Sequence, residues 1–149
     1  MLLLVHIVAG SSIGVLSKNG GEAFALGMLS HFIMDALPHW NYILRVPITL
    51  KKIVAYSPDV LTPLIVFWCF VTAFPEQSGI ITLAALGTVL PDMVSMVALG
   101  SKTLRATVVI RVFQKFHGLL QWEIGIMPGM TVQVLTIALI LLATGVWYP

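Results

Sequence analysis

The chain has 149 residues, of which 58% are hydrophobic and only 9% are charged, and its formal net charge is +2. A soluble globular domain usually carries about 25% charged residues, so a chain this poor in charge cannot cover a water-facing surface. The small net charge gives no argument for nucleic acid as a partner. The composition predicts a protein whose solvent is the lipid bilayer, and the length suits one domain over residues 1–149.

We expect an all-α polytopic membrane protein with about five transmembrane helices. The first two predicted spans cover residues 2–16 and 22–37. The N-terminal segment has no positively charged region, and His6 interrupts its apolar run, so we expect a retained helix and not a cleaved signal peptide. Glycine-rich residues 17–21 are typical of a turn. Pro38 disfavours helix at the preceding residue and closes the second span.

The third and fourth predicted spans cover residues 59–74 and 80–99, with a short turn between them. Pro58 lies near the first helical position of the third span, where the missing N–H of proline costs nothing. The carboxyl group of Asp59 is expected to cap that helix start. Both spans are continuous apolar runs, as a transmembrane helix of about 20 residues requires.

Residues 102–121 differ from the spans around them. Basic and apolar residues are interleaved there at helical spacing, which predicts an amphipathic helix on the membrane surface. Its basic residues are candidates for binding anionic lipid headgroups. The fifth predicted span covers residues 127–147, where Trp147 and Tyr148 suit the aromatic belt at a membrane interface.

The positions of lysine and arginine predict the orientation, because positively charged loops stay in the cytoplasm. With five spans, the second-to-third and fourth-to-fifth connections lie on the same side of the membrane. Those connections hold most of the positive residues: Arg45, Lys51, Lys52, Lys102, Arg105, Arg111 and Lys115. We therefore expect a cytoplasmic N-terminus.

Ionisable residues gather toward the cytoplasmic ends of the predicted spans. An ionisable group in hydrocarbon costs several kcal/mol unless it is paired or hydrated, so such residues indicate function. All four histidines and several of the acids fall on this side. The candidate metal ligands are His6, His31, Asp35, His39, Asp92 and His117.

The densest local pattern lies in residues 30–41. On a helix, His31 and Asp35 are one turn apart, about 6 Å along the axis, and share a face on which they can ligate one ion. Pro38 ends or kinks the helix, which can turn His39 back toward the same ion. Imidazole nitrogen with carboxylate oxygen suits a divalent metal ion, zinc first, with manganese and iron as alternatives. The alternative interpretation is a hydrogen-bonded His–Asp pair that locks the second span.

Two further candidates lie on later segments. Pro91 is expected to kink the fourth span and to open a pocket in which Asp92 is solvated. Alternatively, Asp92 pairs with Ser95 or with a lysine. His117 lies in a polar stripe of the surface helix, together with Gln121, and is either a ligand or simply solvated.

The last candidate, His6, shares a helix face with Gly10 and Gly14. A Gly-x-x-x-Gly pattern permits close helix packing. His6 is therefore either a metal ligand or an interhelical hydrogen bonder.

An early histidine, a His-x-x-x-Asp-x-x-Pro-His segment within a span, a later Pro-Asp and a downstream histidine resemble the small membrane-bound metal-dependent hydrolases. This family includes the LexA-binding, inner-membrane-associated hydrolases of bacteria. The resemblance covers most of the chain, from His6 to about His117. It implies four to six spans in the bacterial inner membrane, a bound divalent metal and hydrolysis of a phosphoester or lipid-linked substrate. It also implies that the six candidates named above form the site.

Three hypotheses follow. The first is a metal-dependent hydrolase at the cytoplasmic membrane surface, with Asp35 or Asp92 as the catalytic base. The second is a non-catalytic accessory subunit packed in a larger membrane protein complex, in which His31 and Asp35 hold helices together. The third is a proton or metal-ion transporter, which needs polar residues through the whole membrane depth. The outer halves of the last three spans offer little beyond threonine for that purpose.

Overall fold

The computed structural model of the chain describes residues 1–41 and 50–146. Its helices are α1 (Leu3–Leu16), α2 (Gly20–Asp35), α3 (Leu50–Ala73), α4 (Ser78–Gly100), α5 (Lys102–Ala106), α6 (Val108–Leu120) and α7 (Ile126–Thr144), and a 3-10 turn, Pro75–Gln77, joins α3 to α4. Within the described ranges no β-strand is present, which confirms the all-α class.

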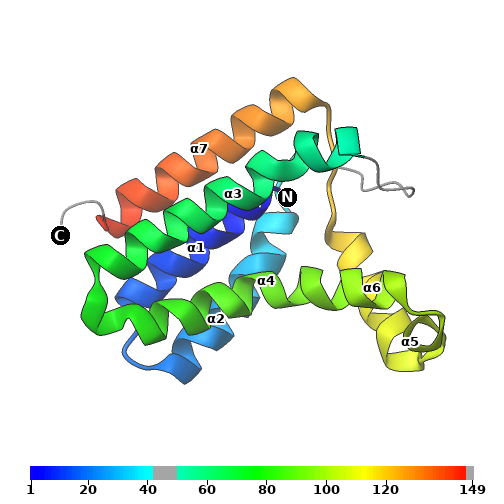
Figure 1. Cartoon of the computed structure of the whole chain (residues 1–149), viewed down its shortest axis with the longest axis horizontal. Coiled ribbons are helices and arrows are strands. Elements are labelled where there is room, and N and C mark those ends of the chain that lie inside the picture. Colours follow the sequence, from blue (N-terminus) through cyan, green and yellow to red (C-terminus); the bar gives the residue numbers. More distant parts are fainter. Residues whose placement is uncertain (42–49, 147–149) are drawn as a thin grey trace.

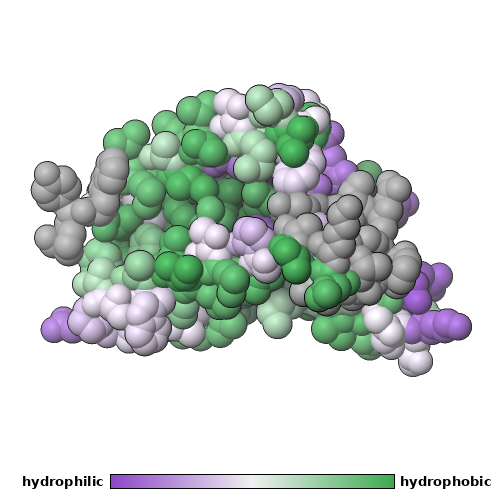
Figure 2. Space-filling model, turned by 45° about the horizontal axis from the view of Figure 1, so that its top comes forward, coloured by the Kyte–Doolittle hydropathy of each residue, from purple (hydrophilic) through white to green (hydrophobic). Residues whose placement is uncertain are grey.

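Three helical segments are long and apolar enough to cross a membrane, namely Tyr56–Ala73, Pro75–Gly100 and Ile126–Thr144. Hydrophobic side chains cover most of the helical body in Figure 2, and hydrophilic ones lie toward its two ends. Both observations are consistent with a membrane protein. Helices α1 and α2 have 14 and 16 residues. At 1.5 Å per residue they reach about 21–24 Å, short of the roughly 30 Å hydrocarbon core. The five predicted spans are therefore not confirmed.

The start of α3 differs from the prediction. The helix begins at Leu50 instead of residue 59, so Pro58 lies inside it and not at its first position. The prediction that Asp59 caps this helix is therefore wrong. Its Oδ1 atom instead accepts a hydrogen bond from the backbone N–H of Leu3, over 3.1 Å. Asp59 thus satisfies a free N–H at the start of a different helix, α1.

The predicted surface helix is divided in two. Thr107, which has extended backbone angles, separates α5 from α6, so the prediction of one continuous helix over residues 102–121 is wrong. The amphipathic character remains in α6. Its exposed large apolar side chains are Val108, Val109, Val112, Phe116 and Leu119. His117 points to the opposite, buried side of the helix.

Glycine allows the inner helices to approach closely. A Cβ atom on Gly10 would lie 2.7 Å from Oγ1 of Thr88 on α4, and one on Gly14 would meet the backbone of Ile81. A Cβ atom on Gly87 would meet the carbonyl oxygen of Phe24 on α2. The predicted close packing at Gly10 and Gly14 is confirmed, and it brings α1 and α2 directly against α4.

The helices run up and down, so that several distant segments meet at one end. In Figure 1, α3 and α4 form a V whose arms separate from the 3-10 turn onward, and α1 lies beside α3. The start of α1, the end of α2, the first half of α3 and the second half of α4 come together, as the contacts of Met1 with Asp35 and of Leu3 with Asp59 show. This end carries the candidate site.

Several residues that predict the orientation lie beyond these ranges. Arg45, Trp147 and Tyr148 are outside the described residues, and so are the side chains of Lys51 and Lys52. The last residue of the predicted fifth span falls there too. The cytoplasmic N-terminus and the aromatic belt therefore remain predictions.

Candidate metal centre

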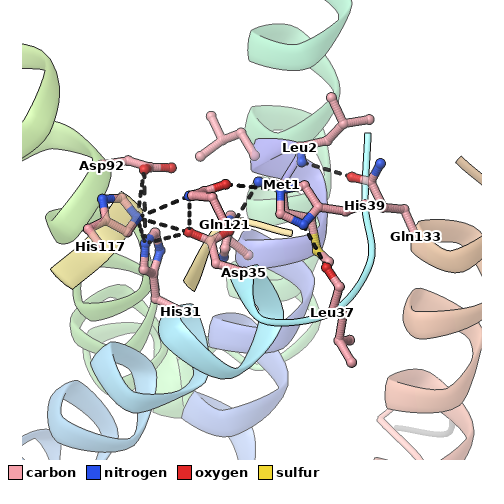
Figure 3. A network of polar contacts seen from close by, with 12 residues as sticks. Met1, Leu2, His31, Asp35, Leu37, His39, Asp92, His117, Gln121 and Gln133 are labelled. Atoms are coloured by element: carbon pink, nitrogen blue, oxygen red, sulfur yellow. Dashed lines mark hydrogen bonds and ion pairs between the residues drawn. The ribbon is translucent and has the colours of Figure 1, made fainter. Parts of the chain in front are cut away.

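Four of the six predicted ligands meet in one cluster. His31 and Asp35 come from α2, Asp92 from α4 and His117 from α6, and one potential ligand atom from each lies within 4.8 Å of the others. Figure 3 shows the four side chains converging from three helices. The prediction from helical spacing that His31 and Asp35 share a face of one helix is confirmed, and both belong to this cluster.

Three of these residues form a tight triangle. Oδ2 of Asp35 lies 3.2 Å from Nε2 of His31 and 2.9 Å from Nε2 of His117, and the two Nε2 atoms are 3.0 Å apart. Oδ1 of Asp92 lies farther out, 3.9 Å and 3.6 Å from the same two nitrogens. In a tetrahedral zinc site with metal–ligand distances of about 2.0–2.2 Å, ligand atoms are about 3.3–3.6 Å apart. The cluster therefore has close to the dimensions that such an ion requires.

The hydrogen bond at the other ring nitrogen of His31 fixes its tautomer. Nδ1 lies 2.7 Å from the backbone carbonyl oxygen of Thr88. A carbonyl oxygen only accepts, so Nδ1 carries the proton and donates it. Nε2, on the other side of the ring, is directed at the Asp35 carboxylate and at His117. Protons on the ring nitrogens or a cation among the three groups can hold these atoms this close together, and a backbone carbonyl that accepts from the far ring nitrogen is typical of a metal-binding histidine.

Asp35 is, like His31, a fully enclosed member of the cluster. Both its oxygens are engaged: Oδ2 also accepts from Nε2 of Gln121 over 2.6 Å, and Oδ1 lies 3.0 Å from the Met1 amino group. Its side chain is 0% exposed. A buried carboxylate is tolerated only when charges and donors surround it, which these contacts supply.

Asp92 and His117 close the cluster from α4 and α6. His117 is 6% exposed, so the alternative that it is simply solvated is wrong. Its Nδ1 lies 3.1 Å from Oγ of Ser95. Asp92 lies near His31 and His117. Ser95, which the sequence offered as an alternative partner of Asp92, contacts His117 instead. The Asp92 side chain is 37% exposed and forms the open side of the cluster.

His6 lies beside the cluster but outside the group of four. Its ring stacks on that of His31, with centroids 4.5 Å apart, and its Nε2 lies 3.3 Å from Oδ1 of Asp35. The side chain is fully buried, and neither ring nitrogen makes a hydrogen bond to the described part of the chain. His6 thus adds an imidazole beside Oδ1 of Asp35, whereas His31 and His117 contact Oδ2.

His39 is also outside the group. Its Nδ1 donates to the carbonyl oxygen of Leu37 over 2.7 Å, and its Nε2 lies 3.0 Å from Oε1 of Gln121. Its backbone pairs with the segment after α6, through bonds of 3.0 Å to Trp122 and 2.8 Å from Ile124. The chain turns at Pro38, but it carries His39 toward that segment and not into the cluster.

Four contributors were not among the predicted ligands, namely Gln121, Ser95, the backbone of Thr88 and the amino group of Met1. Gln121 follows His117 by four residues, and Ser95 follows Asp92 by three. Residues at these spacings share a helix face, so both could have been predicted to lie beside a candidate ligand. Thr88 contributes through its backbone carbonyl group, which every residue has, so the sequence could not identify this position.

The chain matches no protein-family model, and no curated protein or solved structure matches it.

Proposed function

We propose that this protein is a membrane-embedded metal-dependent hydrolase whose centre is built by His31, Asp35, Asp92 and His117. The observation that carries the proposal is the convergence of two imidazole Nε2 atoms and two carboxylates in a space of metal-site dimensions. The tautomer of His31 supports it, because the carbonyl of Thr88 leaves Nε2 free to bind a cation.

His31, Asp35 and His117 would hold the ion, zinc by preference. Three protein ligands with a further open position are the arrangement of catalytic zinc sites, while structural sites are closed by a fourth ligand. A divalent ion bound there supplies Lewis-acid polarisation of the scissile group and lowers the pKa of a coordinated water.

The two predicted catalytic carboxylates have different roles in this proposal. Asp35 is fully buried and both of its oxygens have partners. We therefore assign it the role of a ligand that brings negative charge to the metal, and not the role of the base. Asp92 is partly exposed and lies at the looser distances of 3.6 Å and 3.9 Å from the histidines. A base must be reachable by the proton that it accepts, which favours Asp92.

The proposed location is the cytoplasmic face of the bacterial inner membrane, and the proposed substrate is a phosphoester or lipid-linked molecule. The exposed cations of α5 and α6 support a substrate with negative charge beside the site. These cations are Lys102, Arg105, Arg111 and Lys115. The resemblance in the His-x-x-x-Asp-x-x-Pro-His segment points to the same class of enzyme.

Elemental analysis of the purified protein tests the proposal. The wild-type chain should retain stoichiometric zinc, manganese or iron, and a His31→Ala, Asp35→Ala double variant should lose it. Glu22→Ala is the matched control, because it removes an exposed carboxylate at the opposite end of α2. Asp92→Asn should keep the metal but lose hydrolysis of bis(p-nitrophenyl) phosphate.

Two outcomes would contradict this function. If the double variant kept its metal, the cluster would not be the centre. A wild-type protein that copurifies with fixed partners and without metal would identify the accessory subunit, with the His–Asp contacts held by protons.

A further inference from the structure

A cavity of about 700 Å³ is lined mainly by residues of α3 and α4, with residues of α1 as part of its lining. This volume is within the usual range for sites that bind small molecules, about 300–1,000 Å³. Figure 1 shows that these two helices diverge from the 3-10 turn onward. The cavity is separate from the cluster of ligand atoms, but one wall is shared.

The lining of this cavity is mostly apolar along its whole length, and its two carboxyl groups lie away from the 3-10 turn. Hydrophobic side chains dominate where α3 and α4 are close, among them Leu64, Phe67 and Val89. Carboxyl groups, those of Asp59 and Asp92, occur only toward the end where the metal candidates gather. An amphiphile with an apolar tail and a polar head fits this order.

The polar end adjoins the open side of the cluster. Asp92 lines the cavity, and the other three members of the cluster do not. Ser95 also lines it and contacts His117. A molecule in the cavity would therefore present its polar group to the exposed carboxylate of Asp92, while His31 and Asp35 stay covered.

The length of the cavity along α3 and the basic side chains at the start of α5 both favour a lipid as the bound molecule. From Asp59 to Phe67, α3 rises about 12 Å, comparable with the roughly 15 Å depth of one hydrocarbon leaflet. Leu99 lines the cavity at the end of α4, and α5 begins at Lys102 with exposed basic side chains. Such cations attract the phosphate of an anionic headgroup.

We propose that this cavity binds an acyl chain of an anionic phospholipid, with the headgroup phosphoester at Asp92. The position of the phosphoester at Asp92 and the identification of this lipid as a substrate rest on the proposed hydrolase function, because a bound divalent ion would offset the negative charge of Asp59 and Asp92. The binding of the acyl chain between α3 and α4 does not rest on that function.

Photo-crosslinking tests the binding. The full chain is reconstituted in phosphatidylcholine nanodiscs that contain a small fraction of phosphatidylglycerol with a diazirine on its acyl chain, and labelled peptides are identified by mass spectrometry. Labelling should concentrate several-fold on the cavity-lining residues of α3 and α4 over lipid-exposed residues of α7, such as Leu135 and Leu139. Unlabelled phosphatidylglycerol should compete better than phosphatidylcholine.

Two neighbouring positions give a matched pair of variants. Leu64 and Ile65 are 58% and 63% exposed, but only Leu64 lines the cavity. Leu64→Trp should reduce the labelling of α4 several-fold, and Ile65→Trp should leave it unchanged. Val89→Phe is a smaller cavity-filling change with the same expected direction, and Leu90→Phe is its control outside the lining.

Equal labelling of α7 and of the cavity helices, or equal effects of the Leu64 and Ile65 variants, would overturn the proposal. Equal competition by phosphatidylglycerol and phosphatidylcholine would refute the preference for an anionic headgroup. Metal content is measured in the same samples. Focused labelling without bound metal would support the lipid site while refuting the hydrolase, and stoichiometric metal with dispersed labelling would do the reverse.

Discussion

Gln121 donates a hydrogen bond from its Nε2 atom to Oδ2 of Asp35 over 2.6 Å, and so ties the residue that follows α6 to the last residue of α2. The other end of the same amide, Oε1, lies 3.0 Å from Nε2 of His39. This amide therefore orients the buried carboxylate of the proposed centre (Figure 3).

Replacing Gln121 should weaken metal binding without removing a ligand. Outer-shell partners of metal ligands typically contribute about 10–100-fold to affinity, so Gln121→Ala is expected to lower zinc affinity by that amount. Competition with a chelator of known affinity measures it. Gln114→Ala on α6 is the control and should bind as the wild type does. Equal affinity of the Gln121 variant and the wild type would show that the amide does not support the centre.

His117 and His39 should differ in their effect on metal content. His117 contributes its Nε2 to the group of four, whereas His39 contacts Leu37 and Gln121 outside it. His117→Ala should lose stoichiometric metal in elemental analysis. His39→Ala should retain it, with affinity reduced no more than in the Gln121 variant. Loss of metal in the His39 variant alone would place the centre elsewhere.

Metal affinity should fall as the pH is lowered. Binding needs the lone pairs of Nε2 on His31 and His117, and protons compete for those atoms. The sign follows directly: protonation removes the ligand, so the bound state is favoured at higher pH. Chelator competition at several values between roughly pH 5 and pH 8, where imidazole changes charge, should show a steep decrease toward the acid end. A metal affinity that does not change across this pH range would argue against imidazole ligands.

Two glycines of α4 should respond differently to alanine. A Cβ atom on Gly87 would meet the carbonyl oxygen of Phe24, whereas a Cβ on Gly79 has no neighbour within 4 Å. Gly87→Ala is expected to destabilise the fold by about 1–3 kcal/mol, as overpacked positions do. Gly79→Ala should be neutral or stabilising by about 0.5–1 kcal/mol, because alanine suits a helix better.

Denaturant unfolding in detergent micelles compares these two variants. Similar stability of both would contradict the close contact of α2 with α4 that positions His31 and Asp35 against Asp92.

The local features of the fold and of the site could be predicted from sequence. The all-α class and most helix ends follow from apolar runs, glycine and proline. The His31–Asp35 pair follows from the 3.6-residue period, because residues four apart share a helix face wherever the helix lies. Close packing at Gly10 and Gly14 has the same local origin, since the spacing places both glycines on one face.

Only the tertiary structure decided which distant groups meet. His39, four residues from Asp35, points away, while His117, separated from His31 by 86 positions, brings its Nε2 to within 3.0 Å of the His31 Nε2. Asp59 caps α1 and not its own helix for the same reason. Helical periodicity determines the face on which a side chain lies, but its partner depends on how the helices pack. That packing rests on backbone approach at glycine and on carbonyl groups, such as that of Thr88, which every residue type possesses.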